Sequence, residues 1–403
     1  MRPLIVSVSA LLILAAAGCP GLATAEEGEG EGEEGEGEEG EGEGEGEGEG
    51  EGEGEGEGEG EEGEGEGECF LPDSVVDVVT IPASCSPLII PRTVVVQSSG
   101  FLTFEAGLSA RFADGVGLNV FGSFVADGDD DAPIVLESGD SAVAGAWDGV
   151  RAETGLDLMN LDHVTLRHGG GGLVGAGGCL FVDNAPNALS VTNSRFESCA
   201  ESGVIGIAGV PYVAFADNTF VSCPVGLRIP ANSIGSVGPA QTFIDTPALL
   251  VFSGFVVATQ TWQAQTLPWD FDVNLVVDGG GRPVLTLSPG VVLRFAEFAN
   301  VTVGTKFGGG LVSTSATLEA LDPSGPAGSW TGMRFFNQSL PSNLTDTTVR
   351  QATTGIDLDT TGTNVTVTNS TFEDNGTDIA VDCASTPTLS GNTAAVEQES
   401  PCN

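Results

Sequence analysis

Residues 191–207 read VTNSRFESCAESGVIGI, and residues 213–229 read VAFADNTFVSCPVGLRI. When Asn193 is aligned with Asn218, each segment continues with a hydroxyl residue, a Phe, a Cys and a Gly before a β-branched run. The period is about 25 residues, and a unit of that size cannot bury an apolar face alone. The pair therefore predicts a solenoid in which successive coils stack.

A longer repeat divides the chain. Three motifs recur at a spacing of 183 residues: Leu102–Phe112 as Leu285–Phe295, the G-x-W-x-G-x-R segment Gly145–Arg151 as Gly328–Arg334, and Val164–Arg167 as Thr347–Arg350. Later the copies slip, since VTNSRFESC at 191 matches VTNSTFEDN at 367. We therefore expect two tandem cassettes, residues 69–260 and 261–403, that continue one solenoid of about 13 coils.

The composition after residue 70 favours strands. Val, Thr, Phe and Gly dominate there, and no apolar period of 3.6 residues is sustained. Short β-branched and aromatic runs bounded by Gly, Asn, Asp and Pro are typical of strands. The fold class predicted is all-β, with one elongated body of about 320 residues.

Much of the formal charge of −46 lies in one segment. Residues 26–68 contain 24 Glu and 19 Gly and nothing else, and 34 of the 58 acidic residues lie elsewhere. No basic stripe exists to displace counterions from phosphates, so direct binding to nucleic acid is disfavoured and no nucleic-acid partner is expected. Anionic membrane surfaces are disfavoured for the same electrostatic reason.

Residues 1–25 have the pattern of an export signal. Arg2 precedes the apolar run Leu4–Ala17, which is too short to span a bilayer. Two processing sites compete: a bacterial lipobox that ends at Cys19, which would carry the lipid, and the small-residue site Ala23–Ala25. The protein is expected to be a cell-surface lipoprotein or a secreted protein, with membrane contact only through the lipid.

Residues 26–68 are expected to stay disordered. Their carboxylates repel one another, and their glycines supply maximal backbone freedom without apolar surface to offset the ordering cost. A tract of 43 residues would span roughly 35 Å as a random coil. Beside a lipidated Cys19 it would act as a solvated spacer.

The order of motifs permits a family resemblance. LTLSPGVVLRF, G-x-W-x-G-x-R and V-T-N-S-x-F resemble the right-handed parallel β-helix repeats of bacterial secreted proteins and lipoproteins with the pectin-lyase-like fold. In such coils like side chains stack about 4.8 Å apart. Val191, Phe196, Ile207 and Phe220 are then expected inside, with Asn193 and Asn218 in a ladder at a turn.

Seven cysteines follow Cys19. An exported chain permits disulfides, and stacking brings Cys199 and Cys223 within bonding range. The predicted pairs are Cys69–Cys85, Cys199–Cys223 and Cys383–Cys402, so Cys179 has no predicted partner. The competing choice pairs Cys179 with Cys199. No CxxC motif occurs, so zinc is not expected.

The densest acidic turn is Asp127–Asp131, in which Asp127, Asp129 and Asp131 could bind Ca²⁺. The alternative is a solvated turn between two strands, because an apolar run resumes at once and the EF-hand spacing is absent. No other cofactor is expected.

A cluster of aromatic and basic residues lies between positions 147 and 168, within about one coil. A polysaccharide lyase needs a base and cations that stabilise an anion, and Arg151, His163, Arg167 and His168 supply those groups, with Trp147 as a platform for a sugar ring. Against this, Trp147 and Arg151 recur as Trp330 and Arg334, as structural residues would, whereas the two His residues become Asp346 and Gln351.

The resemblance does not settle an activity, because this fold serves enzymes and non-enzymes. Pectinase-type hydrolases carry Asn-Thr-Asp, Asp-Asp, Gly-His-Gly and Arg-Ile-Lys on adjacent coils, and this sequence lacks that set in order. The leading interpretation is a non-enzymatic surface scaffold for polysaccharide or another cell-surface partner. The alternatives are a polysaccharide lyase or glycoside hydrolase centred on 147–168, and a purely structural envelope protein.

Overall fold

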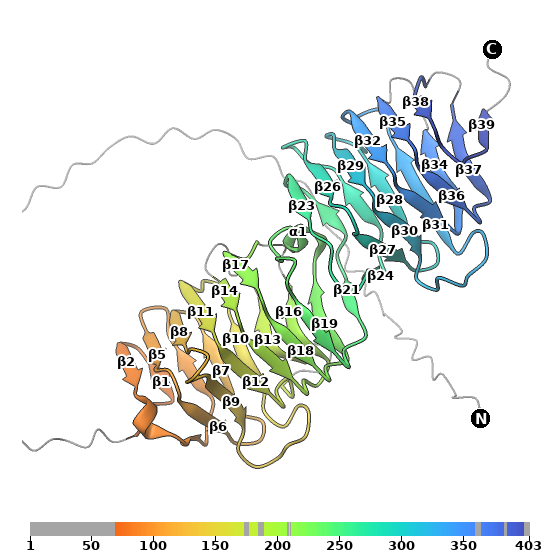
Figure 1. Cartoon of the computed structure of the whole chain (residues 1–403). Helices are drawn as coiled ribbons and strands as arrows, with labels where there is room; N and C mark the ends of the chain where they lie inside the picture. Colours follow the sequence, from red (N-terminus) through yellow and green to blue (C-terminus); the bar gives the residue numbers. More distant parts are fainter. Residues whose placement is uncertain are drawn as a thin grey trace, which may run out of the picture. The chain divides into compact units, whose positions relative to one another are not determined.

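The chain coils into a parallel β-helix (Figure 1). The computed structural model describes residues 69–172, 177–183, 189–207, 209, 211–358, 364–382 and 385–398. Strands pair in parallel in all five sheets. The all-β prediction is confirmed, whereas the right hand of the coil stays a prediction. The leader, the Glu-Gly spacer, Cys19 and the Cys383–Cys402 pair lie outside the described residues.

Sheet 1 runs through the whole helix and has 13 strands, so about 12 full turns separate its first strand from its last. Its strands are β1 (Ser74–Val75), β4 (Val94–Val96), β7 (Gly117–Val120), β10 (Gly149–Ala152), β13 (Gly178–Val182), β16 (Ser202–Gly206), β19 (Val225–Ile229), β21 (Leu249–Val251), β24 (Trp269–Phe271), β27 (Val292–Phe295), β30 (Thr317–Ala320), β33 (Thr348–Arg350) and β36 (Thr371–Glu373).

Two further sheets complete the first half of the helix. Sheet 2 contains β2 (Val78–Ile81), β5 (Phe101–Phe104), β8 (Ser123–Asp127), β11 (Leu158–Asp162), β14 (Leu189–Thr192) and β17 (Ala214–Ala216). Sheet 3 contains β3 (Leu88–Ile90), β6 (Ser109–Phe112), β9 (Ile134–Ser138), β12 (Val164–Arg167), β15 (Arg195–Glu197), β18 (Thr219–Val221) and β20 (Thr242–Ile244). The 3₁₀ turn η1 (Ala83–Cys85) precedes β3.

Two other sheets complete the second half. Sheet 4 contains β22 (Phe255–Val256), β25 (Leu275–Val277), β28 (Asn300–Val303), β31 (Trp330–Phe335), β34 (Ala352–Leu358), β37 (Thr377–Val381) and β39 (Val396–Gln398). Sheet 5 contains β23 (Gln260–Trp262), β26 (Val284–Leu287), β29 (Gly310–Thr314), β32 (Ser342–Thr345), β35 (Val365–Thr368) and β38 (Thr388–Ser390).

The change of sheets occurs at a short helix, α1 (Ala231–Ile234), which follows β19 where a strand of sheet 2 would come. The loop after α1 bonds back to β17 through Gly238 N and Phe215 O, and Ala231 N donates to Ser253 O just before β22. Repeated strands consequently fall on different sheets: β6 of the first copy lies in sheet 3, and its counterpart β27 lies in sheet 1. Each strand of the second copy thus lies one sheet further round the coil than its counterpart in the first copy, so the second copy is turned by one face about the helix axis.

The interior is built by stacking like residues. Phe196, Phe220 and Phe243 form a column with ring centroids 5.1 and 5.3 Å apart. Val191, Phe196 and Phe220 are buried as predicted. Ile207 is 48% exposed, so its predicted place in the core is wrong. It follows the last residue of β16, where the chain leaves the sheet.

The predicted ladder of Asn193 and Asn218 is also wrong. The register pairs Phe196 with Phe220, which sets Ser194 opposite Asn218. Asn218 Oδ1 accepts a hydrogen bond from Ser194 N at 3.0 Å, and Asn218 Nδ2 donates to Val191 O at 2.9 Å. Asn193 instead takes a positive φ of 49° at the corner. The core aromatic residues fix the register, and the Asn alignment was one residue out of step.

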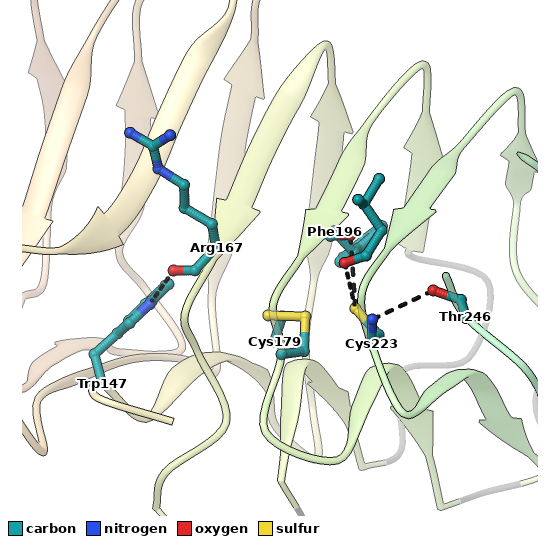
Figure 2. The surroundings of a disulfide bond; sticks show 8 residues. Trp147, Arg167, Cys179, Phe196, Cys223 and Thr246 are labelled. Carbon is teal, nitrogen blue, oxygen red and sulfur yellow. Dashed lines mark hydrogen bonds between the residues drawn. A yellow bond between two sulfur atoms is a disulfide. The ribbon is translucent and has the colours of Figure 1, made fainter. Parts of the chain in front are cut away.

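The disulfides correct one predicted pair. Cys69–Cys85 is confirmed, but Cys199 bonds to Cys179, with a Cα–Cα distance of 5.4 Å, and not to Cys223. Figure 2 shows Cys223 in the next coil, where its thiol lies 3.6 Å from Phe196 O and burial raises its pKa. Cys179 lies on β13, which pairs with β16, and β16 begins just after Cys199. Two disulfides indicate an oxidising compartment, extracellular or periplasmic.

Candidate functional site

Trp147 lies in the core. Its side chain is fully buried, and its Nε1 donates to Arg167 O at 2.8 Å (Figure 2). Its ring stacks on Phe112 with centroids 4.4 Å apart. Trp330 repeats this arrangement with Arg350 O at 2.8 Å and Phe295 at 4.7 Å. The predicted sugar platform at Trp147 is therefore wrong, because a ligand cannot reach a buried indole. The repeated Trp ties two coils together.

The structure does not bring the lyase candidates together as one site. Arg151 lies on β10 of sheet 1 and Arg167 on β12 of sheet 3, whereas His163 and His168 occupy corners at the two ends of β12. His163 and His168 have positive φ angles of 51° and 63°, and Asp346 and Gln351 at the same places in the second copy have 50° and 65°. The His positions are therefore shared corner positions of the repeat.

Arg167 belongs to a row of alternating charges on sheet 3. The register aligns Arg111, Glu137, Arg167 and Glu197. Arg111 Nε lies 3.2 Å from Glu137 Oε1, and Arg167 Nε donates to Glu137 Oε2 at 2.6 Å. We call this row the first charge ladder. Its guanidinium groups are engaged by carboxylates of the protein itself.

The second copy carries its own charge ladder on sheet 1: Asp270, Arg294, Glu319 and Arg350. Arg294 Nε lies 3.1 Å from Asp270 Oδ1, and Arg350 Nε donates to Glu319 at 2.7 Å. Burial raises the pKa of Asp270 to about 6, with Glu319 adding to the rise and Arg294 opposing it. Both ladders cross-link coils by ion pairs that are partly withdrawn from water.

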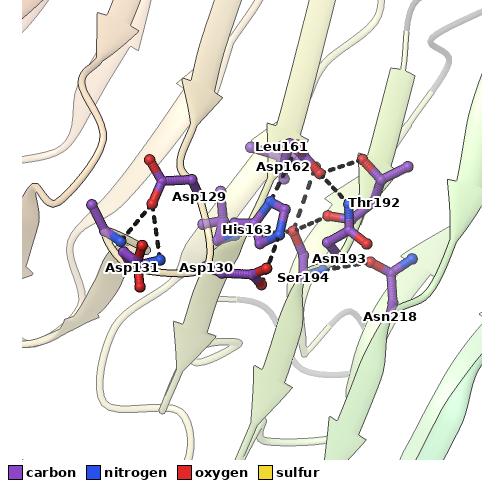
Figure 3. A network of polar contacts seen from close by, with 12 residues as sticks. Asp129, Asp130, Asp131, Leu161, Asp162, His163, Thr192, Asn193, Ser194 and Asn218 are labelled. Carbon is purple, nitrogen blue, oxygen red and sulfur yellow. Dashed lines mark hydrogen bonds and ion pairs between the residues drawn. The ribbon is translucent and has the colours of Figure 1, made fainter.

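The acidic turn at Asp127–Asp131 is organised by hydrogen bonds (Figure 3). Asp129 Oδ1 accepts from the backbone N–H groups of Asp131 and Ala132 at 2.9 and 2.7 Å. Asp130 Oδ1 lies 3.3 Å from His163 Nε2. Across the described part of the chain, no group of three or more His, Cys, Asp or Glu residues is arranged to hold a metal ion. The described geometry is that of a hydrogen-bonded turn between two strands, and Ca²⁺ binding by Asp127, Asp129 and Asp131 stays an untested alternative.

His163 also lies 3.2 Å from Asp162 through its Nδ1 (Figure 3). Asp162 in turn accepts from Thr192 Oγ1 and Asn193 Nδ2 at 2.6 and 2.8 Å. These side-chain bonds, and the contact with His163, lower the pKa of Asp162 against the opposing effect of burial. The network joins three successive coils at one corner.

The two copies of the G-x-W-x-G-x-R motif differ in what surrounds the Arg. Arg151 pairs with Glu153 two residues on, at 2.9 Å, and lies 4.1 Å from the ring of Phe181 on the next coil. Arg334 lies 5.0 Å from the ring of Phe336 two residues on and 3.4 Å from Asp357 on the next coil. The acid and the aromatic ring have exchanged places between the copies.

This exchange opens the surface in the second copy. In the first copy Phe181 is only 4% exposed and the Arg151 side chain 20% exposed, whereas in the second copy the Arg334 and Asp357 side chains are 45% and 34% exposed. A groove of about 260 Å³ lies over β28, β31 and β34. We call it the sheet 4 groove, and it is lined by Asn300, Thr302, Thr331, Gly332, Met333, Arg334, Phe336, Thr353, Thr354 and Asp357.

A bulge shapes the floor of this groove. The pairing of β31 with β34 shifts register between Gly332 and Met333. Gly332 has φ +109°, and a Cβ there would stand 1.7 Å from Thr354 O. Bulges turn side chains and often mark functional surfaces. Burial raises the pKa of Asp357, and the nearby Arg334 opposes this rise.

The sequence did not predict the sheet 4 groove, although Arg334 was recognised as the repeat of Arg151. The available signal was the exchange of Glu153 for Phe336 and of Phe181 for Asp357. The second exchange follows the later spacing of the copies, since Phe181 and Asp357 lie 176 residues apart, as do Val191 and Val367. The register between coils then shows that each of these residues lies beside the Arg of its motif.

No protein-family model and no curated protein sequence matches the chain. Among solved structures, the chain is similar to the catalytic unit of the thermostable GH87 alpha-1,3-glucanase from Streptomyces thermodiastaticus strain HF3-3, at 14% sequence identity and a TM-score of 0.34. The match covers 82% of this chain and 65% of that chain, so this chain spans less than two thirds of it. Within the described residues, no helix has the length and apolarity to cross a bilayer.

Proposed function

We propose that the protein is an exported β-helix scaffold that binds an extended polysaccharide in the sheet 4 groove without cleaving it. The observation that carries this proposal is the difference between the copies: Asp357 stands where the first copy has the buried Phe181, and Arg334 beside it is 45% exposed where Arg151 is 20% exposed. Shallow grooves lined by a few polar groups and an aromatic ring suit sugars, since hydroxyls need hydrogen-bond partners and ring faces need apolar contact.

The geometry of a parallel β-helix supports an extended ligand. Thr302, Arg334 and Asp357 occupy one row across three coils of sheet 4. Neighbouring strands lie about 4.8 Å apart, so the row presents polar groups at a spacing close to the length of one sugar unit. A polymer can therefore meet several coils at once, and weak single contacts add through multivalency.

Binding without cleavage is favoured over a lyase reaction because the basic candidates are separate and paired. Arg167 is held by Glu137, and Arg151 by Glu153. Cations that stabilise a developing anion must converge on the reacting atoms. We further propose that Cys19 carries a lipid and that the Glu-Gly tract holds the β-helix away from the membrane.

The test is affinity electrophoresis of the exported chain in gels that contain neutral or uronate polysaccharides. We expect retardation by at least one polymer and a loss of about tenfold in affinity for Arg334→Ala, as fits a charge-assisted hydrogen bond. Arg151→Ala is the matched control, because this counterpart lies against Phe181 outside the groove.

Products are assayed in parallel for unsaturated ends and new reducing ends. We expect neither. Cleavage that Arg167→Ala abolishes would replace the scaffold by the enzyme, and the absence of retardation by every polymer would remove polysaccharide as the ligand.

A further inference from the structure

The charges of the sheet 4 groove cancel within the groove. Arg334 and Asp357 are the only charged residues among the described residues that line it, and Arg334 Nε lies 3.4 Å from Asp357 Oδ2. The other polar lining groups are hydroxyls and one amide, from Asn300, Thr302, Thr331, Thr353 and Thr354. A uronate carboxylate would therefore compete with Asp357 for the same guanidinium.

The charge of the whole chain acts in the same direction. With 58 acidic and 12 basic residues, the protein carries a negative field that repels polyanions at ionic strengths where screening is incomplete. A neutral polymer has no such barrier. Charge therefore favours a neutral glycan over an acidic one.

The carboxylate of the Arg334–Asp357 pair can accept hydrogen bonds from the hydroxyls of a neutral sugar. A carboxylate is an acceptor with two oxygens, and two hydroxyls on adjacent sugar carbons can donate to those oxygens together. Arg334 Nε lies 3.4 Å from one of these oxygens, Asp357 Oδ2, and so orients the carboxylate. Hydrogen bonds to charged groups contribute more than neutral ones.

We propose that the sheet 4 groove selects neutral polysaccharides that expose a vicinal diol, with Asp357 accepting both hydroxyls and Arg334 orienting that carboxylate. This inference rests on the proposed function, since it names the class of polysaccharide that the groove binds. It predicts that linkage matters: a 1,4-linked hexan keeps its 2,3-diol free in every unit, whereas an internal unit of a 1,3-linked hexan has no vicinal diol.

The experiment is calorimetric titration of the exported chain with three polymers of matched length: a neutral 1,4-linked hexan, its C6-oxidised uronate form, and the 1,3-linked isomer. We expect the neutral 1,4-linked polymer to bind about tenfold more tightly than either of the others. Asp357→Asn should lower that affinity by about tenfold, because the amide keeps the size but only one acceptor oxygen. Arg151→Ala should leave it unchanged.

The outcomes separate the two proposals. Tighter binding of the uronate form, equal binding of the two linkages, or an unchanged affinity in Asp357→Asn would overturn the diol inference while glycan binding stands. No binding of any polymer would overturn both. The comparison of the three polymers uses the unmodified protein, so it decides the inference even where Asp357→Asn does not fold.

Discussion

Trp330→Ala is expected to lower the free energy of unfolding by about 4 kcal/mol, as is typical for the loss of a buried Trp. The indole is fully buried, stacks on Phe295 at 4.7 Å and donates to Arg350 O at 2.8 Å, so the variant loses packing and leaves a carbonyl without its donor. Urea denaturation followed by Trp fluorescence and circular dichroism measures the change.

Trp147→Ala is the matched variant, because Trp147 makes the same two contacts in the first copy. We expect a similar loss at both positions. Trp330→Phe keeps an aromatic ring but removes the N–H donor, and should cost about 1–3 kcal/mol. A Trp330→Ala protein within 1 kcal/mol of the parent would contradict the assignment of this Trp to the core.

Gly332→Ala is expected to cost on the order of 3 kcal/mol, because it combines backbone strain with a clash. Gly332 has φ +109°, and a Cβ would stand 1.7 Å from Thr354 O on the neighbouring coil. The strands β31 and β34 must then move apart at the bulge. The measurement is the denaturation midpoint.

Gly155→Ala separates strain from clash. Gly155 has φ +92°, and a Cβ there would meet nothing within 4 Å. The variant therefore loses stability only through the strain of a positive φ in Ala, about 1 kcal/mol. Equal losses in the two variants would show that the close approach of Thr354 O does not constrain β31.

Much of the fold can be predicted from sequence, because residues that recur at the period of the repeat stack on one another in successive coils. The stacking of Phe196 over Phe220 identifies equivalent places in successive coils. The 183-residue spacing of the Trp motifs identifies residues that make the same contacts in the two copies. This is enough to predict parallel strands and a continuous core. The second Gly of G-x-W-x-G-x-R also has a clear role, since Gly149 and Gly332 both take positive φ beside a carbonyl of the next coil.

Sequence reasoning failed where a shift of one residue or one face decides the outcome. Alignment on Asn193 placed it opposite Asn218, but the aromatic core pairs Ser194 there. Cys199 and Cys223 occupy matching places in their coils, yet Cys199 bonds to Cys179 on β13. The turn of the second copy by one face moved its charge ladder from sheet 3 to sheet 1, which no spacing could reveal.

The candidate site was missed for a related reason. The sequence motifs pointed to Trp147 and Arg167 as candidate site residues. In the structure both stabilise the coil, Trp147 through its buried hydrogen bond and Arg167 through its ion pair. The groove arises where the copies differ, at Phe336 and Asp357, and Asp357 acquires meaning only through its register with Arg334.

The most direct test of the account is hydrogen exchange measured by mass spectrometry with and without the neutral 1,4-linked hexan. If the sheet 4 groove binds the polymer, protection rises in peptides that cover 300–303, 330–336 and 352–358 and does not change in peptides that cover 147–168. Protection of 147–168 with none in β31 and β34 would contradict the claim that the second copy carries the binding surface.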